Sequence, residues 1–343
     1  MIFMAKLLLN TCMFGCLALY LSFTSFLILD SGNMSRLFSP IFAQTKNIPE
    51  KIYSRQVNGN YQWKKLINDA AFPKSYNFQL FSHNDTLWAF HSAGNWYSVD
   101  GKTWRKSALQ NVLHNLAFLD YVYFKNAVLA LGQFDGNIEK YRLTTSIHRT
   151  KDFKNWELLS TESNLPKRFF YHPFVFNNKI WIIGGSDGNE EYNDAWSSED
   201  GVHWKKQADN LPFGRRANQQ FVVFKNKIFM LDSEVWTSVD GINWNRLTPQ
   251  IVREKIFGYA TVVYDNRIWL LGCNRNGQFT SKVLTSEDGK TWAEQDAPWS
   301  ARGGIAACTH KGKIYMTGGK YGGTPNQPEF IYSNDVWSLG MFQ

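Results

Sequence analysis

Three arginines occupy equivalent places in this sequence and have the chemistry to bind a charged ligand. Each of them lies eight residues before the Phe or His that ends a β-prone segment, and the three are Arg168, Arg216 and Arg302. Guanidinium groups bind carboxylate, sulfate or phosphate through bidentate, charge-assisted hydrogen bonds. Together with Lys255, which lies beside the equivalent place in a further segment, the arginines would form a cationic rim for an anionic ligand.

Neutral residues next to the arginines would complete such a site. Hydroxyl, amide and imidazole groups combined with aromatic rings are typical of a sugar-binding site. These neighbours are Tyr171, His172, Asn218, Gln219 and Tyr259. A competing interpretation is that each arginine caps backbone carbonyls or pairs with an acid such as Asp194 or Asp335, and repeat packing favours it.

The elements that must position these residues are repeats. Residues 96–104, Trp-Tyr-Ser-Val-Asp-Gly-Lys-Thr-Trp, are matched without gaps by 196–204, 236–244 and 284–292, and in degenerate form by 148–156. Asp-Gly between two β-prone segments predicts a type I′ hairpin, in which both central residues have positive φ. Phe153 replaces the glycine in the degenerate copy, so the turn type there stays open.

A second repeated pattern precedes each of these hairpins. Two apolar segments flank a polar turn in residues 174–185, 222–231, 262–272 and 308–319. Continuous apolar runs such as 180–183 indicate strands that are covered on both faces, as in blades packed around an axis. Each repeat therefore predicts four strands.

The spacing of the repeats predicts a β-propeller. The Trp residues that end the units lie at 63, 104, 156, 204, 244 and 292, which is 40 to 52 residues apart. The final unit runs through 334–338 and lacks its own closing strand, whereas residues 61–66 have no preceding hairpin partner. We expect this N-terminal strand to complete the last blade, so that residues 61–343 form six blades in a ring without an open edge.

Further motifs carry a resemblance to a known family. Gly184-Gly185 and Gly318-Gly319 end apolar strands, and Asn-Asp precedes Trp in 192–196 and 332–337. With these motifs residues 61–343 resemble Kelch repeats of the galactose-oxidase central-domain type, although three copies lack the double glycine. The Ser-x-Asp-Gly-x-Thr-Trp segments are also similar to the Asp-box of sialidase-like propellers, one residue short. Either resemblance implies a propeller, and neither fixes a function, because this fold hosts enzymes, lectins and adaptors.

The same resemblance leaves a glycan-active enzyme, similar to a sialidase or a sialic-acid epimerase, as an alternative to a binding module. It would hold an acidic sugar with the arginine cluster at the mouth of the central channel. A sialidase would also need a Tyr nucleophile supported by Glu, and an Asp acid. No motif identifies such catalytic residues. The seven His show no clustering typical of metal ligands, so no metal or other cofactor is expected.

Cysteine usage and composition bound the remaining possibilities. Four Cys are too few for a disulfide scaffold. Cys273 and Cys308 fall on inner strands of adjacent repeats, where a disulfide and two buried thiols are both open alternatives. A chain of 343 residues that is 44% hydrophobic and 16% aromatic is not mostly disordered. The net charge of +8 favours anionic surroundings, but Lys and Arg are scattered, so no nucleic-acid partner is expected.

An apolar run near the N-terminus predicts contact with a membrane. Residues 7–29 are long enough to span a bilayer, and residues 39–44 resemble a signal-peptidase site with Ala43 as the last removed residue. Residues 1–43 are therefore interpreted as a signal peptide or an N-terminal membrane anchor, and 44–60 as a linker. Both alternatives place the protein outside the cytoplasm, secreted or membrane-anchored.

Together these patterns predict an exported, non-catalytic, all-β Kelch-like propeller that presents a loop face to a protein or anionic glycan partner. The glycan-active enzyme is the alternative. An enzyme needs acid, base or nucleophile groups within reach of one another in one pocket, whereas a binding module can lack perturbed ionisable groups.

Overall fold

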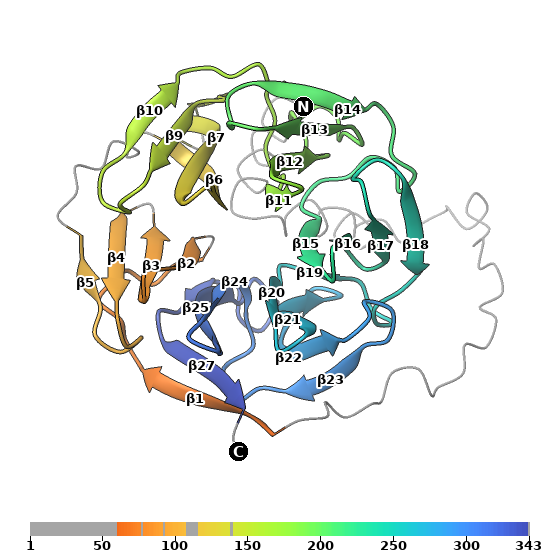
Figure 1. The fold of residues 1–343 in the computed structure, drawn as a ribbon. Helices are drawn as coiled ribbons and strands as arrows, with labels where there is room; N and C mark the ends of the chain where they lie inside the picture. Colours follow the sequence, from red (N-terminus) through yellow and green to blue (C-terminus); the bar gives the residue numbers. More distant parts are fainter. Residues whose placement is uncertain (1–59, 77, 92, 108–115, 138–139, 342–343) are drawn as a thin grey trace, which may run out of the picture.

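Six β-sheets surround a common axis in the computed structural model, which describes residues 60–341 apart from 77, 92, 108–115 and 138–139 (Figure 1). The described residues contain no helix, and the prediction of an all-β, six-bladed propeller is confirmed. The expected signal peptide or anchor at 1–43 and the linker, up to residue 59, lie outside the described residues. Within the described part of the chain, no helix has the length and apolar character needed to cross a membrane.

Each of the first three blades is built from one stretch of chain. Blade 1 contains β2 (Gln79–His83), β3 (Thr86–His91), β4 (Gly94–Ser98) and β5 (Arg105–Lys106). Blade 2 contains β6 (Leu116–Phe124), β7 (Ala127–Asn137), β9 (Ile147–Thr150) and β10 (Glu157–Ser160), with β8 (Lys140–Leu143) paired to β7. Blade 3 contains β11 (Phe174–Phe176), β12 (Lys179–Ile183), β13 (Ala195–Ser198) and β14 (Trp204–Ala208).

The other three blades include the two ends of the described chain. Blade 4 contains β15 (Gln220–Phe224), β16 (Lys227–Leu231), β17 (Val235–Ser238) and β18 (Trp244–Thr248). Blade 5 contains β20 (Ala260–Tyr264), β21 (Arg267–Arg275), β22 (Gln278–Ser286) and β23 (Ala293–Asp296), with β19 (Ile256–Phe257) also paired to β21. Blade 6 contains β24 (Gly303–His310), β25 (Lys313–Tyr321), β26 (Ile331–Tyr332), β27 (Val336–Met341) and β1 (Tyr61–Ile67). Strand β1 lies on its outer edge, antiparallel to β27, with Tyr61 opposite Met341.

The turn that joins the two inner strands of each blade has the type I′ signature of two consecutive residues with positive φ. In blade 3 these are Asn177 (φ 49°) and Asn178 (φ 58°). The equivalent pairs are Asn84-Asp85, Lys125-Asn126, Lys225-Asn226, Asp265-Asn266 and Lys311-Gly312. The type I′ turns are therefore the polar turns between the two inner strands of each blade.

The Asp-Gly turns have another geometry, and the prediction of type I′ is wrong for them. Gly241 has a φ of 81°, but Asp240 does not have a positive φ. Instead, the Asp240 carboxylate accepts hydrogen bonds from the backbone N–H groups of Ile242 (2.8 Å) and Asn243 (2.7 Å). Burial alone would raise the pKa of Asp240, but hydrogen bonds from Asn243 and its neighbours hold it at about 2. The same backbone contacts surround Asp100, Asp152, Asp200 and Asp288.

The glycine of this turn faces the neighbouring blade and must lack a side chain. A Cβ added to Gly241 would lie 2.8 Å from the ring of Trp181 in blade 3. Trp244 Nε1 in turn donates a hydrogen bond to the Gly241 carbonyl oxygen (3.1 Å). Phe153 takes the place of the glycine in blade 2 with a φ of 61°, and its buried ring lies 5.4 Å from that of Trp88 in blade 1. Each turn thus joins two blades.

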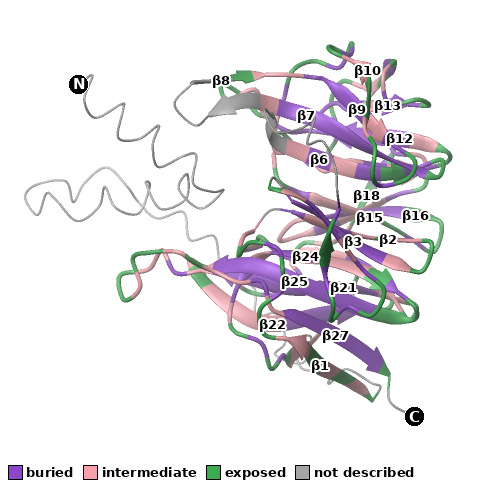
Figure 2. Cartoon of the chain, turned by 90° about the vertical axis from the view of Figure 1, so that its left-hand side faces the viewer, coloured by how far each residue is buried: buried purple, intermediate pink, exposed green. Residues whose placement is uncertain are grey.

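Hydrophobic cores fill the spaces between adjacent blades. Between blades 3 and 4, for example, Phe174 and Trp181 pack with Ile228 and Trp244. Figure 2 shows buried residues mainly along the strands and exposed residues at the connections. This packing between blades fixes the position of each innermost strand around the axis, and so positions the loops that lead into it.

The two cysteines on inner strands are unpaired. Cys273 and Cys308 are both free thiols, and Cys273 Sγ lies 3.4 Å from Thr280 Oγ1. Burial raises the pKa of the Cys308 thiol to about 12. Of the two alternatives that the sequence left open, the structure has the thiols and not the disulfide.

Candidate functional site

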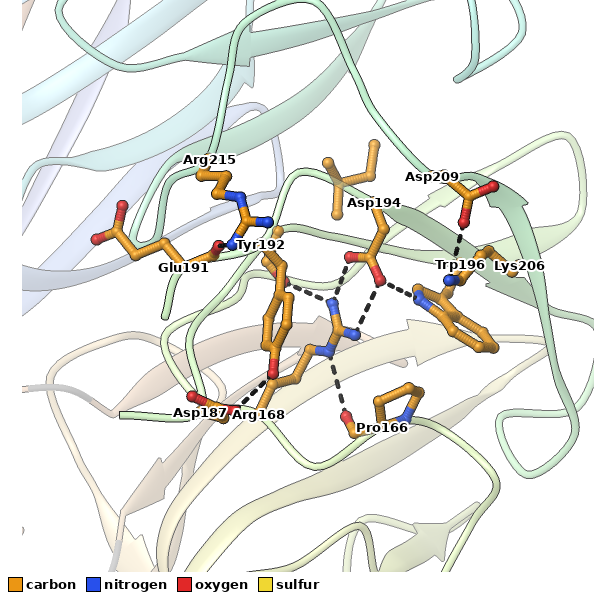
Figure 3. Close-up of polar contacts among 12 residues, drawn as sticks. Pro166, Arg168, Asp187, Glu191, Tyr192, Asp194, Trp196, Lys206, Asp209 and Arg215 are labelled. Carbon is orange, nitrogen blue, oxygen red and sulfur yellow. Dashed lines mark hydrogen bonds and ion pairs between the residues drawn. The ribbon is translucent and has the colours of Figure 1, made fainter. Parts of the chain in front are cut away.

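The first arginine of the expected cationic rim is engaged inside the protein. Arg168 is 1% exposed, and its Nη1 and Nη2 donate to the Asp194 carboxylate at 2.6 and 3.1 Å (Figure 3). It also donates to the carbonyl oxygens of Gly184 (3.0 Å) and Pro166 (3.2 Å). The ring of Tyr192 lies 4.5 Å from the guanidinium carbon. The protein itself therefore satisfies this charge.

The other two arginines are paired at the equivalent places. Arg302 is 2% exposed and donates from Nη2 to Asp335 at 3.1 Å. Arg216 donates to Asp232 (3.2 Å) and Glu234 (3.0 Å). These contacts correct the expectation of an open cationic rim, because each guanidinium is neutralised by acids of its own blade. The competing interpretation, in which the arginines pair with acids and cap carbonyls, describes the observed contacts.

The remaining predicted site residues divide into buried and accessible ones. Three are buried between blades: Tyr171, Gln219 and Tyr259. Three are partly or fully exposed on loops that lead into innermost strands: His172, Asn218 and Lys255. We call the end of the propeller at which these loops lie the mouth. Only the accessible group can contact a ligand without a change in blade packing.

One position on or just before the innermost strand recurs in every blade. It is the fifth residue before the first residue of each type I′ turn. The six residues at this position, here called the axial ring, are Gln79, Asp120, His172, Gln220, Ala260 and Ala306. The residues of the axial ring are polar in blades 1 to 4, whereas Ala260 and Ala306 in blades 5 and 6 pack against the hydrophobic cores between blades.

Asp120 is the centre of the polar part of the axial ring. It is 6% exposed, and its Oδ1 accepts a hydrogen bond from Gln79 Nε2 of blade 1 (3.3 Å). Gln133 Nε2 of blade 2 donates to Oδ2, and His172 Nδ1 of blade 3 lies 3.9 Å from Oδ1. Among the residues that the structure describes, no Lys or Arg forms an ion pair with this carboxylate. Three blades thus converge on one acid without a permanent counter-ion.

The surroundings shift the protonation of both ionisable groups. Burial raises the pKa of Asp120 to about 7, against the opposing effect of the hydrogen bond from Gln133. Desolvation lowers the pKa of His172 to about 4, although 32% of its side-chain surface is accessible. At neutral pH the imidazole is therefore uncharged, and the carboxyl group is divided between its two forms. Perturbed acids of this kind are typical of functional sites.

The mouth loops above the axial ring are bulky in some blades and bare in others. Two residues before the axial ring, φ is positive at Phe170 (57°), Asn218 (66°), Gly258 (69°) and Gly304 (68°). A Cβ added to Gly258 would meet only Gly304 N, at 3.9 Å, whereas one added to Gly304 would lie 3.2 Å from the Tyr76 side chain. Blade 5 therefore leaves open space at the mouth.

Hydrogen bonds connect these loops to the buried acid. The backbone N–H of Phe170 donates to Gln133 Oε1 (2.7 Å), and the same amide group reaches Asp120 through Nε2. Asn218 N donates to the Phe170 carbonyl oxygen (2.7 Å). A ligand that moves the mouth loops would therefore also act on Asp120. No group of three or more His, Cys, Asp or Glu within the described ranges could hold a metal ion.

Sequence reasoning named His172 but missed Gln79, Asp120 and Gln133. The sequence pattern could have identified Gln79 and Asp120, because the residue four positions before the end of each innermost strand belongs to the axial ring. Gln133 lies on β7, at an irregularity in its pairing with β6, and simple counting does not reach it.

Comparisons with known proteins agree with this fold. The fold and these comparisons define a β-propeller domain. The family model described as "DUF6242 beta propeller domain" matches residues 152–260, from the end of blade 2 to the start of blade 5. A solved structure described as "Structure of YjhT" is similar with a TM-score of 0.61 and 13% sequence identity, over 79% of this chain and 96% of that chain. No curated protein matches the sequence.

Proposed function

We propose that this protein is an exported, non-catalytic, Kelch-like β-propeller that binds its partner at the mouth, over the polar part of the axial ring. The observation that carries the proposal is the convergence of Gln79, Gln133 and His172 on Asp120. A buried acid without a counter-ion is destabilising, and proteins retain such features mainly where function requires them.

The contacts of the arginines bear on the kind of partner. An anionic glycan held by Arg168 and Arg302 has little support, because Asp194 and Asp335 already occupy these guanidinium groups. The accessible groups at the mouth, which belong to His172, Asn218 and Lys255, include both hydrogen-bond donors and acceptors and suit a polar partner, either a protein segment or a glycan. Export is supported by the apolar run 7–29 and the signal-peptidase-like segment that ends at Ala43.

A glycan-active enzyme is the second candidate, and the Asp120–His172 pair favours it. A carboxyl group with a pKa of about 7 next to an uncharged imidazole has the properties of a general acid or base. Hydrolysis by two carboxylates would need a second acid, and Asp120 is the one acid of the axial ring. Release of a new product from a glycan panel, lost in Asp120→Asn, would establish the enzyme and contradict a non-catalytic module.

The binding proposal is tested by filling the open space at the mouth. Gly258→Asn adds a side chain there with a φ that Asn218 already adopts at the equivalent position, so the fold is retained. We expect binding of the full-length protein to a glycan array, or to the surface proteins of its own cells, to fall about tenfold or more, because contact at the mouth is blocked.

The matched control makes the same substitution at the opposite end of an innermost strand. Gly312→Asn also enters open space, in a type I′ turn where Asn178 holds the equivalent position. Binding should remain at the wild-type level in this variant. Equal loss in both variants, or loss in neither, contradicts a binding site at the mouth.

A further inference from the structure

We infer that Asp120 receives the side chain of a lysine from a protein partner, which enters the mouth and supplies the counter-ion that the propeller lacks. The inference rests on the proposed function and adds the class of partner and the contact that it makes.

The two buried aspartates of the described chain differ in their partners. Asp194 is 8% exposed and forms a bidentate ion pair with Arg168. Asp120 is 6% exposed, and its hydrogen-bond donors are the neutral amides of Gln79 and Gln133. A buried carboxylate with neutral partners is stabilised less than one with a cation. A cationic ligand would therefore stabilise the Asp120 carboxylate by an ion pair, as Arg168 stabilises that of Asp194.

The carboxylate keeps capacity for such a ligand. Each carboxylate oxygen can accept two hydrogen bonds, and the amides of Gln79 and Gln133 use one at each oxygen. An ammonium group has three donors and no acceptor, so it matches the lone pairs that remain. The free lone pairs of the Asp120 carboxylate can only accept hydrogen bonds, and an ammonium group can only donate them.

Access to Asp120 favours a slender side chain. Since 6% of the residue is exposed, a cation must arrive at the end of a narrow stem. Lysine carries a compact ammonium on a flexible four-carbon chain, whereas the planar guanidinium of arginine is wider. The ammonium of an amino sugar is attached directly to a ring, which is bulkier still. These differences favour a protein segment over a glycan.

The groups that face Asp120 do not compete with an incoming cation. Gln79 on β2, Gln133 on β7 and His172 in the loop before β11 contact the carboxylate, and Tyr121 on β6 and Tyr171 before β11 are close enough to interact with it electrostatically. Burial raises the pKa of both tyrosines above the usual range, and His172 is uncharged at neutral pH. Asp120 is the one charged member of this group near pH 7.

The experiment measures binding of a minimal lysine to the full-length protein by titration calorimetry. The probe is Nα-acetyl-lysine methylamide, and Nα-acetyl-norleucine methylamide is its uncharged analogue. We expect the lysine probe to bind and the norleucine probe not to bind. Asp120→Asn should weaken binding about tenfold or more, because a buried ionic contact is lost. Asp209→Asn, which changes an exposed aspartate on the outside of blade 3, should leave it unchanged.

The pH dependence gives a second readout. With a pKa of about 7, the ionised fraction of Asp120 falls about 30-fold between pH 8 and pH 5.5, while the lysine ammonium stays charged. The affinity of the wild-type protein should fall to a similar degree, and that of Asp120→Asn should stay constant. Equal binding of the norleucine probe, or affinity that is independent of pH, overturns the inference.

Two outcomes separate this inference from the proposed function. Tighter binding of glucosamine than of the lysine probe overturns the protein partner in favour of an amino sugar. If no lysine probe binds but Gly258→Asn still abolishes binding on the array or to surface proteins, the inference is overturned and the proposed function stands.

Discussion

The Asp-Gly turns and the mouth loops are both repeated around the propeller, but their copies vary to different degrees. Five turns keep the same aspartate contacts to the backbone, and four of them also keep the Trp hydrogen bond to the glycine carbonyl. At the mouth, one structural position is held by Phe170, Asn218, Gly258 and Gly304. The turns join blades and are therefore constrained by packing, whereas the mouth is free to become asymmetric, as recognition of a ligand requires.

The largest effect is expected at the buried arginines, which lie in the segments that lead into the innermost strands but are held by acids of their own blades. Arg168→Ala would leave Asp194 buried without a cation, so we expect the free energy of unfolding to fall by about 3–5 kcal/mol. Chemical denaturation monitored by tryptophan fluorescence measures it. Arg215→Ala removes an exposed pair with Glu190 and should cost less than about 1 kcal/mol. Similar small losses in both variants would show that Arg168 is not a packing residue and would reopen the arginine rim.

A smaller effect is expected at the turns. Asp240→Ala removes the acceptor of two backbone N–H groups, and we expect a loss of about 1–2 kcal/mol in the free energy of unfolding. Because the pKa of Asp240 is about 2 in the folded protein and about 3.9 in an unfolded chain, this contribution is complete above pH 4. It is lost as the pH falls from 4 towards 2.

The same denaturation series checks that pH window. The difference between wild type and Asp240→Ala should be constant from pH 5 to 8 and should shrink below pH 4. Asp209→Ala, at an exposed aspartate that pairs with Lys206, serves as the control and should stay close to wild type throughout. A difference that grows on acidification would mean that the carboxylate does not hold this turn.

Much of the fold could be predicted because the repeats carry the same strands and turns many times. The sequence predicts the type I′ turn at Asp-Gly, whereas the structure has it between the two inner strands of each blade, and the reason is local. Asp-Gly fits a type I′ turn, but the Asp240 side chain bonds to the two N–H groups that follow, which stabilises a different turn. The true type I′ turns include Lys225 (φ 49°), a residue that sequence patterns do not associate with positive φ.

The candidate site was harder to predict because its contacts join residues that are far apart in the sequence. Repeat alignment placed Arg168 and Arg302 at one position. It could not show that each of them pairs with an aspartate of its own blade, which lies 26 residues after Arg168 and 33 residues after Arg302. The cluster at Asp120 depends on three blades at once, and the bond from Gln133 depends on an irregularity in strand pairing. Such contacts follow from packing and not from local pattern.

The smallest effect should have the opposite sign and lies at the mouth. Asp120→Asn should stabilise the fold by about 1 kcal/mol at pH 8, because an ionised carboxyl group buried without a cation is replaced by a neutral amide. The pKa of Asp120 is about 7 when folded and about 3.9 when unfolded, so its ionisation opposes folding increasingly as the pH rises from 4 to 7. The gain should therefore shrink towards pH 4 in thermal denaturation. Asp194→Asn leaves the buried Arg168 without its counter-ion and should destabilise the fold at pH 8. If both variants destabilise the fold, Asp120 is a packing residue like Asp194.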